Sequence, residues 1–568
     1  MGEEVLAIST SNDLTSGPDP GPPPATPLAD GRDSQTEVLR NTAIMSLGTT
    51  LSRVTGFVRL AAMTYALGIA GSRMADTFNV ANTTPNIIYE LALGGVLSSV
   101  FVPVFVDWMQ SRGREEAWDV SQRVMTLTVV SLSAIALLGI VAAPAIISLY
   151  TVGGAEDAHA QALGTYFLRW FAPQIAFYGI GAVATGLLNA HRRFAPPMFA
   201  PVLNNVIGTA TFLAVALLPG AHPPTPDTIT TTQRLVLAIG TTAGVATMSL
   251  VLLPSLRRLG WRWRWNFHWR HEAVLRIAHL AKWTIVYVAV NQIGLLIVIV
   301  IAYGLGDGDY TAYVVAFVIF QLPHAIFAVS VFTAILPGMS ASSAAGDLAG
   351  YRTLLSRGIR LNAAVIVPAA LGYIALAVPI VRLLFERGAV DPAEARLVAS
   401  ILVAFSVGMF PFSLFQLLLR AFYAMQDTRT PALINIGAVT VNILANLALV
   451  FALGLGVQGL ALGYAAAYAF AATLSLVVIR RRVGHLDGRA TIATIARVVA
   501  ASAASAGAAW LVADAVGRGI GTANVSGQAI QVFAAVLTGV LVFVASALIF
   551  RIEEVDTVKR AIMARFHR

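Results

Sequence analysis

Long apolar segments alternate with short polar ones along most of the chain. From residue 38 to residue 550 the apolar runs recur, and many approach the length of about 20 residues that a helix needs to cross a bilayer. Lipid offers no hydrogen-bond partner to a bare backbone, so we expect these segments to be helices. Fourteen membrane spans are predicted, near residues 38–68, 76–107, 119–149, 159–189, 195–219, 233–255, 273–304, 311–339, 351–385, 394–424, 430–454, 456–479, 492–514 and 528–550.

The charges of the polar segments indicate which side of the membrane each segment occupies. Segments after even-numbered spans are rich in arginine, whereas those after odd-numbered spans are short, polar or acidic, such as GIAGSRMAD and TVGGAEDAHA. Basic loops are usually retained in the cytoplasm. The alternation therefore predicts a multi-pass protein of the cytoplasmic (inner) membrane with both termini in the cytoplasm.

The composition agrees with this interpretation and excludes several classes of protein. Hydrophobic residues make up 57% of the 568 residues and charged residues 12%, against about 25% charged residues in soluble proteins. The net charge of +9 is expected of basic cytoplasmic loops, so no nucleic-acid partner is predicted. Cysteine is absent, which excludes disulfides and thiolate metal sites. No catalytic motif is found, and we predict no enzyme activity, cofactor or bound metal.

An internal repeat relates the two halves of the chain. The segment NAHRRFAPPMFAPVLNN joins spans four and five, and YAMQDTRTPALINI joins spans ten and eleven. Aligning Ala190 with Ala424 also aligns Pro197 with Pro431. Equivalent spans are six apart, so the halves have the same orientation in the membrane. Parallel repeats are typical of transporters whose substrate site lies between the halves.

The predicted fold is an all-α polytopic membrane protein with two six-helix lobes in a parallel pseudo-repeat and two C-terminal helices. The basic and aromatic loop between the lobes is typical of membrane anchors that attract anionic lipids, and binding of nucleic acid is the less favoured interpretation. The parts are a disordered cytoplasmic tail (1–36), the first lobe (37–256), the basic and aromatic loop (257–272), the second lobe (273–482), two further spans (483–550) and a basic cytoplasmic tail (551–568).

Charged residues interrupt the first two spans. Arg53 and Arg59 lie in span one, and Asp76 and Glu90 lie in span two. A charge near the centre of a spanning helix costs about 2.5–3.5 kcal/mol, so it usually faces a protein interior or a wet cavity. We favour a cavity lining over a stripe that only joins helices. The residues that share one face of span two at helical spacing are Asp76, Asn79, Asn82, Asn86, Glu90 and Gly94.

The two arginines indicate what such a cavity would bind. Arg53 and Arg59 are about 120° apart around the helix. Guanidinium groups bind phosphate in a bidentate manner, and a lipid-linked diphosphate is the natural membrane ligand for them. For either arginine alone, extension of the side chain to the membrane surface is the alternative. Asp76, Asn86 and Glu90 are predicted to complete the substrate site.

Four residues are predicted hinges. Pro85 lies in span two and Pro323 in span eight, and a proline removes one backbone donor and bends a helix. Gly94 and Gly95 follow in span two and permit close packing or flexing. These residues would allow the halves to move against each other.

A candidate site for a monovalent cation lies on spans seven and eleven. Asn291, Asn442 and Asn446 could coordinate a cation through their carbonyl oxygens, although helix joining is the favoured interpretation. Coupling of transport to such a cation or to the membrane potential is the expectation. His324, which follows the proline of span eight, is expected to be a packing residue.

The chain resembles the MurJ/MviN family of the multidrug/oligosaccharidyl-lipid/polysaccharide exporter superfamily. The resemblance covers about residues 38–550 and implies a lipid II flippase for peptidoglycan synthesis. It also implies a cationic cavity between two six-helix lobes and a groove for the undecaprenyl tail at spans 13 and 14. Arg53 and Arg59 match the cavity arginines of the family, and Asp76 matches an acidic position at the outer end of span two. The motifs that carry the resemblance are SRVTGFVR (52–59), ADTFNVANTTPN (75–86), GLLNAHRRFAPPMFAPVLNNV (186–206) and FYAMQDTRTP (422–431).

Two places depart from the pattern of the family. The family often has arginine four residues after the proline of span two, where this chain has Tyr89 followed by Glu90. It often has an Arg and Glu pair before the proline of span eight, where this chain has Val318 and Gln321. The cavity is therefore expected to be less cationic. We predict a lipid II flippase that works by alternating access. The alternatives are an exporter of another lipid-linked glycan or drug, and a transport-inactive membrane scaffold for cell-wall synthesis proteins.

Overall fold

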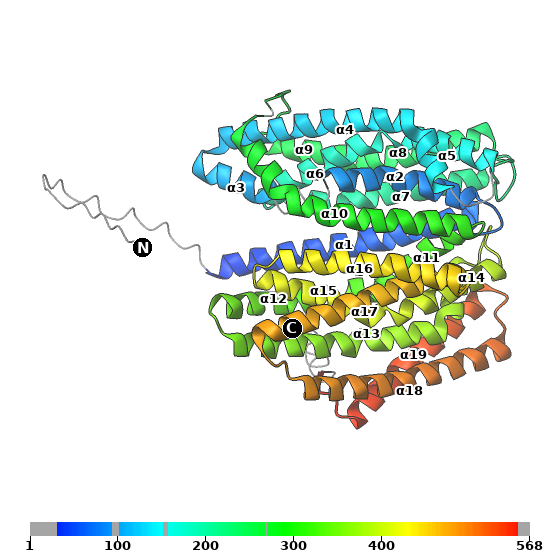
Figure 1. Cartoon of the computed structure of the whole chain (residues 1–568). Coiled ribbons are helices and arrows are strands. Elements are labelled where there is room, and N and C mark those ends of the chain that lie inside the picture. The colour runs from blue at the N-terminus through cyan, green and yellow to red at the C-terminus, as the bar shows by residue number, and fades with distance from the viewer. Residues whose placement is uncertain (1–30, 94–100, 152–156, 269, 555–568) are drawn as a thin grey trace, which may run out of the picture.

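The computed structural model describes residues 31–93, 101–151, 157–268 and 270–554. All regular elements in these ranges are helices, and most of them lie side by side along one direction (Figure 1). The elements are α1 (Gly31–Leu67), α2 (Met74–Leu93), α3 (Val102–Ser111), α4 (Arg114–Tyr150), α5 (Ala158–Phe171), α6 (Gln174–Ala190), α7 (Ala195–Leu217), α8 (Thr231–Leu250), α9 (Leu252–Arg258), α10 (Glu272–Leu305), α11 (Asp309–Pro323), the π-helical turn η2 (His324–Ala328), α12 (Val329–Ala344), α13 (Leu348–Phe385), α14 (Pro392–Val407), α15 (Met409–Ala424), α16 (Arg429–Leu447), the π-helical turn η3 (Ala448–Ala452), α17 (Gly456–Val483), α18 (Gly488–Ile520) and α19 (Val525–Ile549).

Each predicted span coincides with one described helix or with consecutive helices, except that residues 94–100 of span two lie outside the described residues. In the described ranges, 11 helices or joined helices are long and apolar enough to cross a membrane. The pair α14 and α15, which is bent by 48° at its junction, makes a twelfth. α1 and α2 lie outside this set because they carry the polar and charged residues of predicted spans one and two. The all-helical membrane fold is confirmed, and the structure is consistent with fourteen spans.

The ends of the predicted parts fall close to helix boundaries. α1 begins at Gly31, so the helix starts inside the segment 1–36 that the sequence predicts as a tail. Residues 1–30 and 555–568 lie outside the described residues. The predicted loop 257–272 begins at the end of α9 and ends at the start of α10.

The basic and aromatic loop is fixed to α4 through some of its side chains. Trp261 is buried and donates its indole N–H to Ser121 Oγ at 2.8 Å. Trp265 and Phe267 are exposed instead, with their rings stacked at a centroid distance of 6.0 Å. The loop therefore belongs structurally to the first half and presents aromatic side chains outward, as a membrane anchor would.

The internal repeat appears in the structure at several equivalent positions. α5 and α14 both begin after an aspartate, Asp157 or Asp391, whose carboxylate accepts backbone N–H groups of the first turn. The turns after α6 and α15 each contain a left-handed residue, Arg192 with φ 57° and Gln426 with φ 58°. In both turns the next residue donates its N–H to the carbonyl five positions earlier, at 2.8 and 3.0 Å. The two residues of each pair are separated by the same number of residues as Ala190 and Ala424. The repeat predicted from the sequence is therefore also a repeat of local structure.

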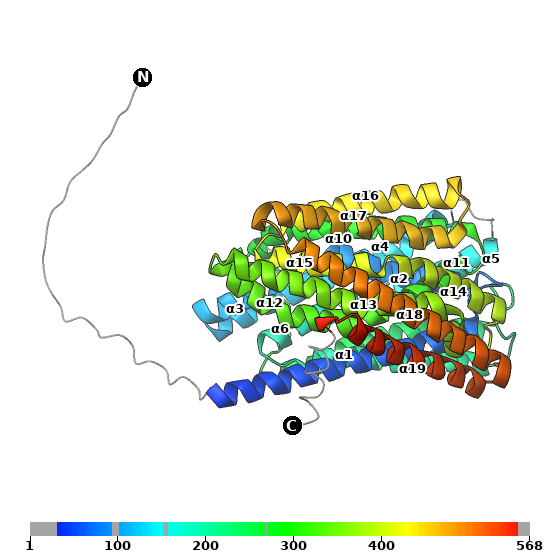
Figure 2. The ribbon, with the colours of Figure 1, turned by 90° about the horizontal axis from the view of Figure 1, so that it is seen from below.

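The two halves face each other along the middle of the molecule. Helices α1 to α9 form the first half and α10 to α17 the second. α1 packs along α7, whereas α10 packs against α2 and α4 of the first half and α16 of the second. α1 and α10 therefore lie at the boundary between the halves (Figure 1). α18 and α19 pack on each other and on α13, on the side of the second half that faces away from the first (Figure 2).

Candidate functional site

Asp76, a predicted substrate residue in the first turn of α2, joins the two halves. Its buried carboxylate accepts hydrogen bonds from Gly308 N–H at 2.9 Å, Thr311 N–H at 2.7 Å and Thr311 Oγ1 at 2.6 Å. α11 begins directly after Gly308, which has no side chain that could cap the helix. Asp76 supplies this cap from the other half, and its charge is favoured at a helix N-terminus. In this conformation protein donors occupy both carboxylate oxygens.

Further contacts hold the same ends of the two halves together. Arg73 forms an ion pair with Asp307 at 2.8 Å, and Ala70 N–H donates to Glu394 Oε1 at 2.8 Å. Gly308 permits the close approach, because its φ is +84° and a Cβ there would lie 2.1 Å from a backbone oxygen of the first half. In the predicted orientation this end faces the outside. The contacts are called the outer latch: Ala70 with Glu394, Arg73 with Asp307, and Asp76 with Gly308 and Thr311.

Arg59 lines a cavity of about 190 Å³ between the halves. The walls include Asn82 and Asn205 from the first half and Val318 from the second. The Arg59 side chain lies against Gly208, where a Cβ would come within 2.8 Å of the Arg59 Nε. A glycine at this position of α7 therefore leaves room for the guanidinium beside the cavity.

The Arg59 guanidinium has no protein counter-ion within the part of the chain that the structure describes. No ion pair or hydrogen bond joins it to a described residue, and no acidic side chain acts on it there. A lone charge in the membrane interior is unfavourable unless it meets water or an anion. The cavity is therefore suited to an anionic group.

Two further arginines, Arg53 and Arg420, belong to different halves. Arg53 is exposed on α1, and Arg420 of α15 stacks over the Phe332 ring at 4.9 Å from its centroid. Both arginines lie close enough to His324 to act on it electrostatically. Sequence reasoning missed Arg420, for which the available signal was a single arginine inside the apolar run LLLRAFY. His324 itself contacts Ser413 Oγ at 3.1 Å, in agreement with a packing role.

The polar face of α2 divides into parts with different surroundings. At its outer end Asn79 donates to Thr311 Oγ1 at 3.1 Å and so joins the helices of the two halves. Asn82 lines the Arg59 cavity, Asn86 is exposed, and Glu90 near the inner end is partly exposed. The face therefore combines the two interpretations that the sequence left open, because it joins helices at one end and lines a cavity further in.

The predicted hinge residues have different local structures. Pro85 lies inside α2 without ending the helix. Pro323 is the last residue of α11 and is followed by the π-helical turn η2 before α12 begins. A proline that lacks its N–H beside a wide turn is a common place for a helix to bend. Gly94 and Gly95 lie outside the described residues.

The asparagines of the candidate cation site come together in the second half. Asn291 and Asn442 line a cavity of about 200 Å³ together with Asn435. Asn446 donates its amide to Asn442 Oδ1 at 3.2 Å. In the described ranges no group of three or more His, Asp or Glu residues clusters as metal ligands do. The pocket is thus built from neutral amides and aromatic rings.

These features define a class: an α-helical membrane transporter of two parallel repeats that face each other across an anion-attracting cavity. The sequence model of the family described as "Lipid II flippase MurJ" matches residues 63–522. The chain therefore belongs to the MurJ family, as its motifs predicted.

Relatives and solved structures agree with this assignment. A protein from Vibrio cholerae called "Probable lipid II flippase MurJ" is 29% identical over 83% of this chain and 88% of its own length. One of the same name from Rhizobium tropici is 31% identical over 77% of this chain and 80% of its own. The structure of a lipid II flippase MurJ in an inward closed conformation matches with a TM-score of 0.73 at 20% identity, covering 90% of this chain and 99% of that one. An inward-facing multidrug transporter of the MATE family, in the MOP superfamily, matches with a TM-score of 0.60 at 15% identity, covering 76% of this chain and 96% of that one. The two structural matches show the shared fold.

Proposed function

We propose that the protein flips lipid II, an undecaprenyl-diphosphate-linked glycan, from the inner to the outer leaflet of the cytoplasmic membrane. The observation that carries the proposal is Arg59, a guanidinium between the halves that pairs with no anion among the described residues. The relatives from Vibrio cholerae and Rhizobium tropici are named as probable lipid II flippases. The diphosphate of such a lipid is the anion that arginine recognises in a bidentate manner.

Arg53 and Arg420 attract the diphosphate toward the region of Arg59. Arg53 on α1 and Arg420 on α15 approach His324 from opposite halves, so a diphosphate between them meets positive charge on both sides. Arg420 adds a cation on the second half, whose lining residue in the Arg59 cavity is the neutral Val318. Electrostatic attraction of this kind raises the local concentration of an anionic ligand.

Alternating access moves the bound lipid. The outer latch closes one end of the interface between the halves, so lipid II enters from the inner side. Opening to the outside requires Asp76 to leave the N-terminus of α11, while α2 and the α11–α12 junction bend at Pro85 and Pro323. The two halves have the same orientation, which permits them to rock about a site between them.

An ion or the membrane potential supplies the driving force. Moving one elementary charge through 100 mV is worth about 2.3 kcal/mol, and the unpaired arginines carry charge within the membrane. The neutral pocket lined by Asn291 and Asn442, with Asn446 bonded to Asn442 beside it, is the place we propose for a monovalent cation, held by amide oxygens. Transport then depends on the potential or on a cation gradient.

Lipids contact the protein at two further places, a cavity near the C-terminal helices and the loop 257–272. A cavity of about 550 Å³ between α13, α14, α18 and α19 combines apolar residues such as Ile374, Val378 and Trp510 with the charged Arg396 and Asp514. We place the undecaprenyl tail along its apolar part. The exposed side chains of the loop 257–272 contact anionic lipids of the inner leaflet, with both termini in the cytoplasm. Other cell-wall synthesis proteins are the proposed partners.

A reconstituted flipping assay tests the proposal. Vesicles that contain the protein receive fluorescent lipid II in both leaflets, and a membrane-impermeant reductant then quenches the dye of the outer leaflet. We expect wild-type vesicles to lose nearly all fluorescence, Arg59→Ala to flip at least about tenfold more slowly, and Arg59→Lys to retain an intermediate rate. Arg480→Ala removes an exposed arginine in the last turn of α17 and serves as the matched control.

Two results separate the alternatives. Failure of wild-type vesicles to flip lipid II, combined with movement of another lipid-linked glycan, would make the protein an exporter of that glycan. Full rescue of depleted cells by the Arg59→Ala variant, with no flipping in vesicles, would leave a scaffold role.

A further inference from the structure

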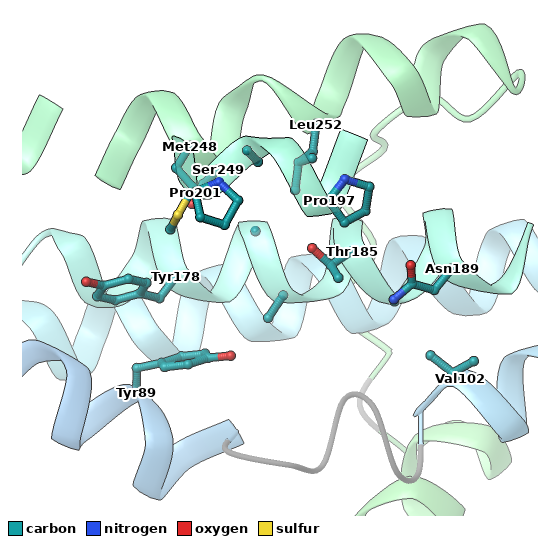
Figure 3. Close-up of a pocket in the computed structure, with 14 residues that line it drawn as sticks. Tyr89, Val102, Tyr178, Thr185, Asn189, Pro197, Pro201, Met248, Ser249 and Leu252 are labelled. Carbon is teal, nitrogen blue, oxygen red and sulfur yellow. The ribbon is translucent and has the colours of Figure 1, made fainter. Parts of the chain in front are cut away.

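A second cavity, of about 290 Å³, lies inside the first half and shares no lining residue with the Arg59 cavity. Its walls come mainly from α2, α6, α7 and α8 (Figure 3). Tyr89 and Tyr178 lie opposite each other at one end, with ring centroids 5.4 Å apart, and Asn189 lies near the other end. None of the described residues that line it is charged. The cavity is therefore suited to a neutral ligand with polar and apolar faces.

Two polar atoms in its wall have no protein partner. Ser249 is fully buried, and its Oγ makes no hydrogen bond with any described residue. The Oδ1 of Asn189 is buried and unbonded in the same way. Buried polar side chains in proteins are nearly always hydrogen-bonded, so these two atoms indicate a binding partner for the cavity. Thr185 adds a hydroxyl between them, on the same helix as Asn189.

The cavity is a specific feature of the first half. At the interval of the internal repeat, Thr185 corresponds to Leu419 and Gly181 to Phe415, so the second half carries large side chains where the first half carries small ones. Gly181 has a structural reason, because a Cβ there would lie 2.8 Å from Ser249 Oγ. Small residues thus keep the space open, and Gly181 lets the buried Ser249 pack against α6 at the wall of the cavity.

The cavity begins beside the candidate anion site. Pro201 in its wall lies one helical turn from Asn205 of the Arg59 cavity on α7, and Tyr89 lies about two turns from Asn82 on α2. A ligand whose anionic group sits at Arg59 therefore has its next chemical group near Tyr178 and Tyr89. Tyrosine rings pack against the apolar faces of sugar rings, while hydroxyl and amide groups bond their edges.

We propose that this cavity binds the sugar ring nearest to the diphosphate of the lipid-linked substrate. The ring lies between Tyr89 and the α7–α8 wall, and its hydroxyl and amide groups bond Ser249, Thr185 and Asn189. The inference rests on the proposed function, since it requires a diphosphate-linked glycan at Arg59. The family often has arginine at the position of Tyr89. In this chain we assign the tyrosine to contact with a neutral sugar.

Binding measurements on the full-length protein in nanodiscs test the assignment. Two probes are compared: undecaprenyl diphosphate without a sugar, and undecaprenyl diphosphate that carries a single N-acetylated sugar. Thr185→Leu fills the cavity with the residue that the repeat has at the equivalent position, and Ser249→Ala removes one hydroxyl without adding volume. Thr440→Leu, at an exposed threonine of α16, makes the same change outside the cavity and is the control.

We expect wild type to bind the sugar-bearing probe about tenfold or more tightly than the bare diphosphate. Thr185→Leu should abolish this preference and Ser249→Ala should reduce it about fivefold, both with unchanged affinity for the bare diphosphate. Arg59→Ala should weaken both probes. The inference is overturned if wild type shows no preference, if Thr185→Leu keeps it, or if Thr185→Leu and Ser249→Ala weaken both probes equally. Loss of the proposed function gives a different result, namely no effect of Arg59→Ala on either probe.

Discussion

Removing the Asp76 carboxylate should open the outer end of the molecule. Asp76 accepts three hydrogen bonds from the N-terminus of α11, at 2.6 to 2.9 Å. One hydrogen bond to a charged group contributes about 1.5–3 kcal/mol, but burying a carboxylate costs several kcal/mol. We therefore take about 3 kcal/mol as the free energy by which Asp76→Ala destabilises the closed state relative to the open state. This changes the ratio of closed to open molecules by about 100-fold. If the open state of wild type is populated at about 1%, the variant populates both states about equally.

Distances between spin labels measure this change directly. The chain has no cysteine, so two introduced cysteines are unique labelling positions. Ala158 at the start of α5 and Arg387 after α13 are exposed and report on the outer ends of the two halves. Wild type should give mainly one short distance, and Asp76→Ala should add a longer distance of comparable weight. Asp76→Asn should add the longer distance with a smaller weight, because its Oδ1 can still accept from Thr311 while its NH2 group cannot accept from Gly308 N–H.

A matched control distinguishes opening from general damage. Asn524 caps α19 by accepting a hydrogen bond from Gly527 N–H at 2.8 Å, away from the interface between the halves. Asn524→Ala removes a helix cap of similar chemistry and should leave the label distances unchanged. An unchanged distance distribution in Asp76→Ala would refute the latch and leave Asp76 as a buried residue that only stabilises the fold.

Three further predictions concern the latch, the cavity and the inner surface. Gly308→Ala should also open the outer end and slow flipping, because a Cβ there would lie 2.1 Å from a backbone oxygen of the first half; the same label distances check it. Arg420→Ala should slow flipping in vesicles about tenfold, whereas Arg420→Lys should retain part of the rate. Burial acts to raise the pKa of Asp427, but hydrogen bonds from Thr430 and the ion pair with Arg482 outweigh it and lower that pKa. The stability that this pair contributes is present at neutral pH and lost as the pH falls below about 4 through the lowered pKa, so Asp427→Asn should remove that part of the acid dependence of thermal unfolding.

The fold could be predicted from the sequence because its signals are local. The apolar length that makes a helix span a membrane lies within the residues of that helix. The repeat was visible from one pair of turns, where Arg192 and Gln426 need the same left-handed backbone. Limits of single helices were less certain, since residues 31–36, which the sequence assigns to the tail, lie in α1.

The site was only partly predictable because its contacts join distant parts of the chain. Asp76 was expected to bind substrate, but its partners are backbone N–H groups more than 200 residues away, which leave no pattern in a sequence. Arg420 was passed over because its neighbours along the chain are apolar, and its approach to α1 depends on how the halves pack. Arg59 could be noticed as a charge within a span, since that signal needs no partner, and the structure places it beside a cavity between the halves.

The placement of these groups on α2 links substrate binding to gating. Asp76 lies at the outer end of this helix, Asn82 lines the Arg59 cavity, and Tyr89 lines the cavity of the first half. Pro85 lies between the last two, where a missing backbone hydrogen bond lowers the resistance to bending. A ligand that draws Tyr89 toward a sugar and Asn82 toward a diphosphate therefore acts on the same helix that holds the latch closed. Because Asp76 leaves α11 only if the outer turn of α2 moves, binding energy at the two cavities is available to open the outer end.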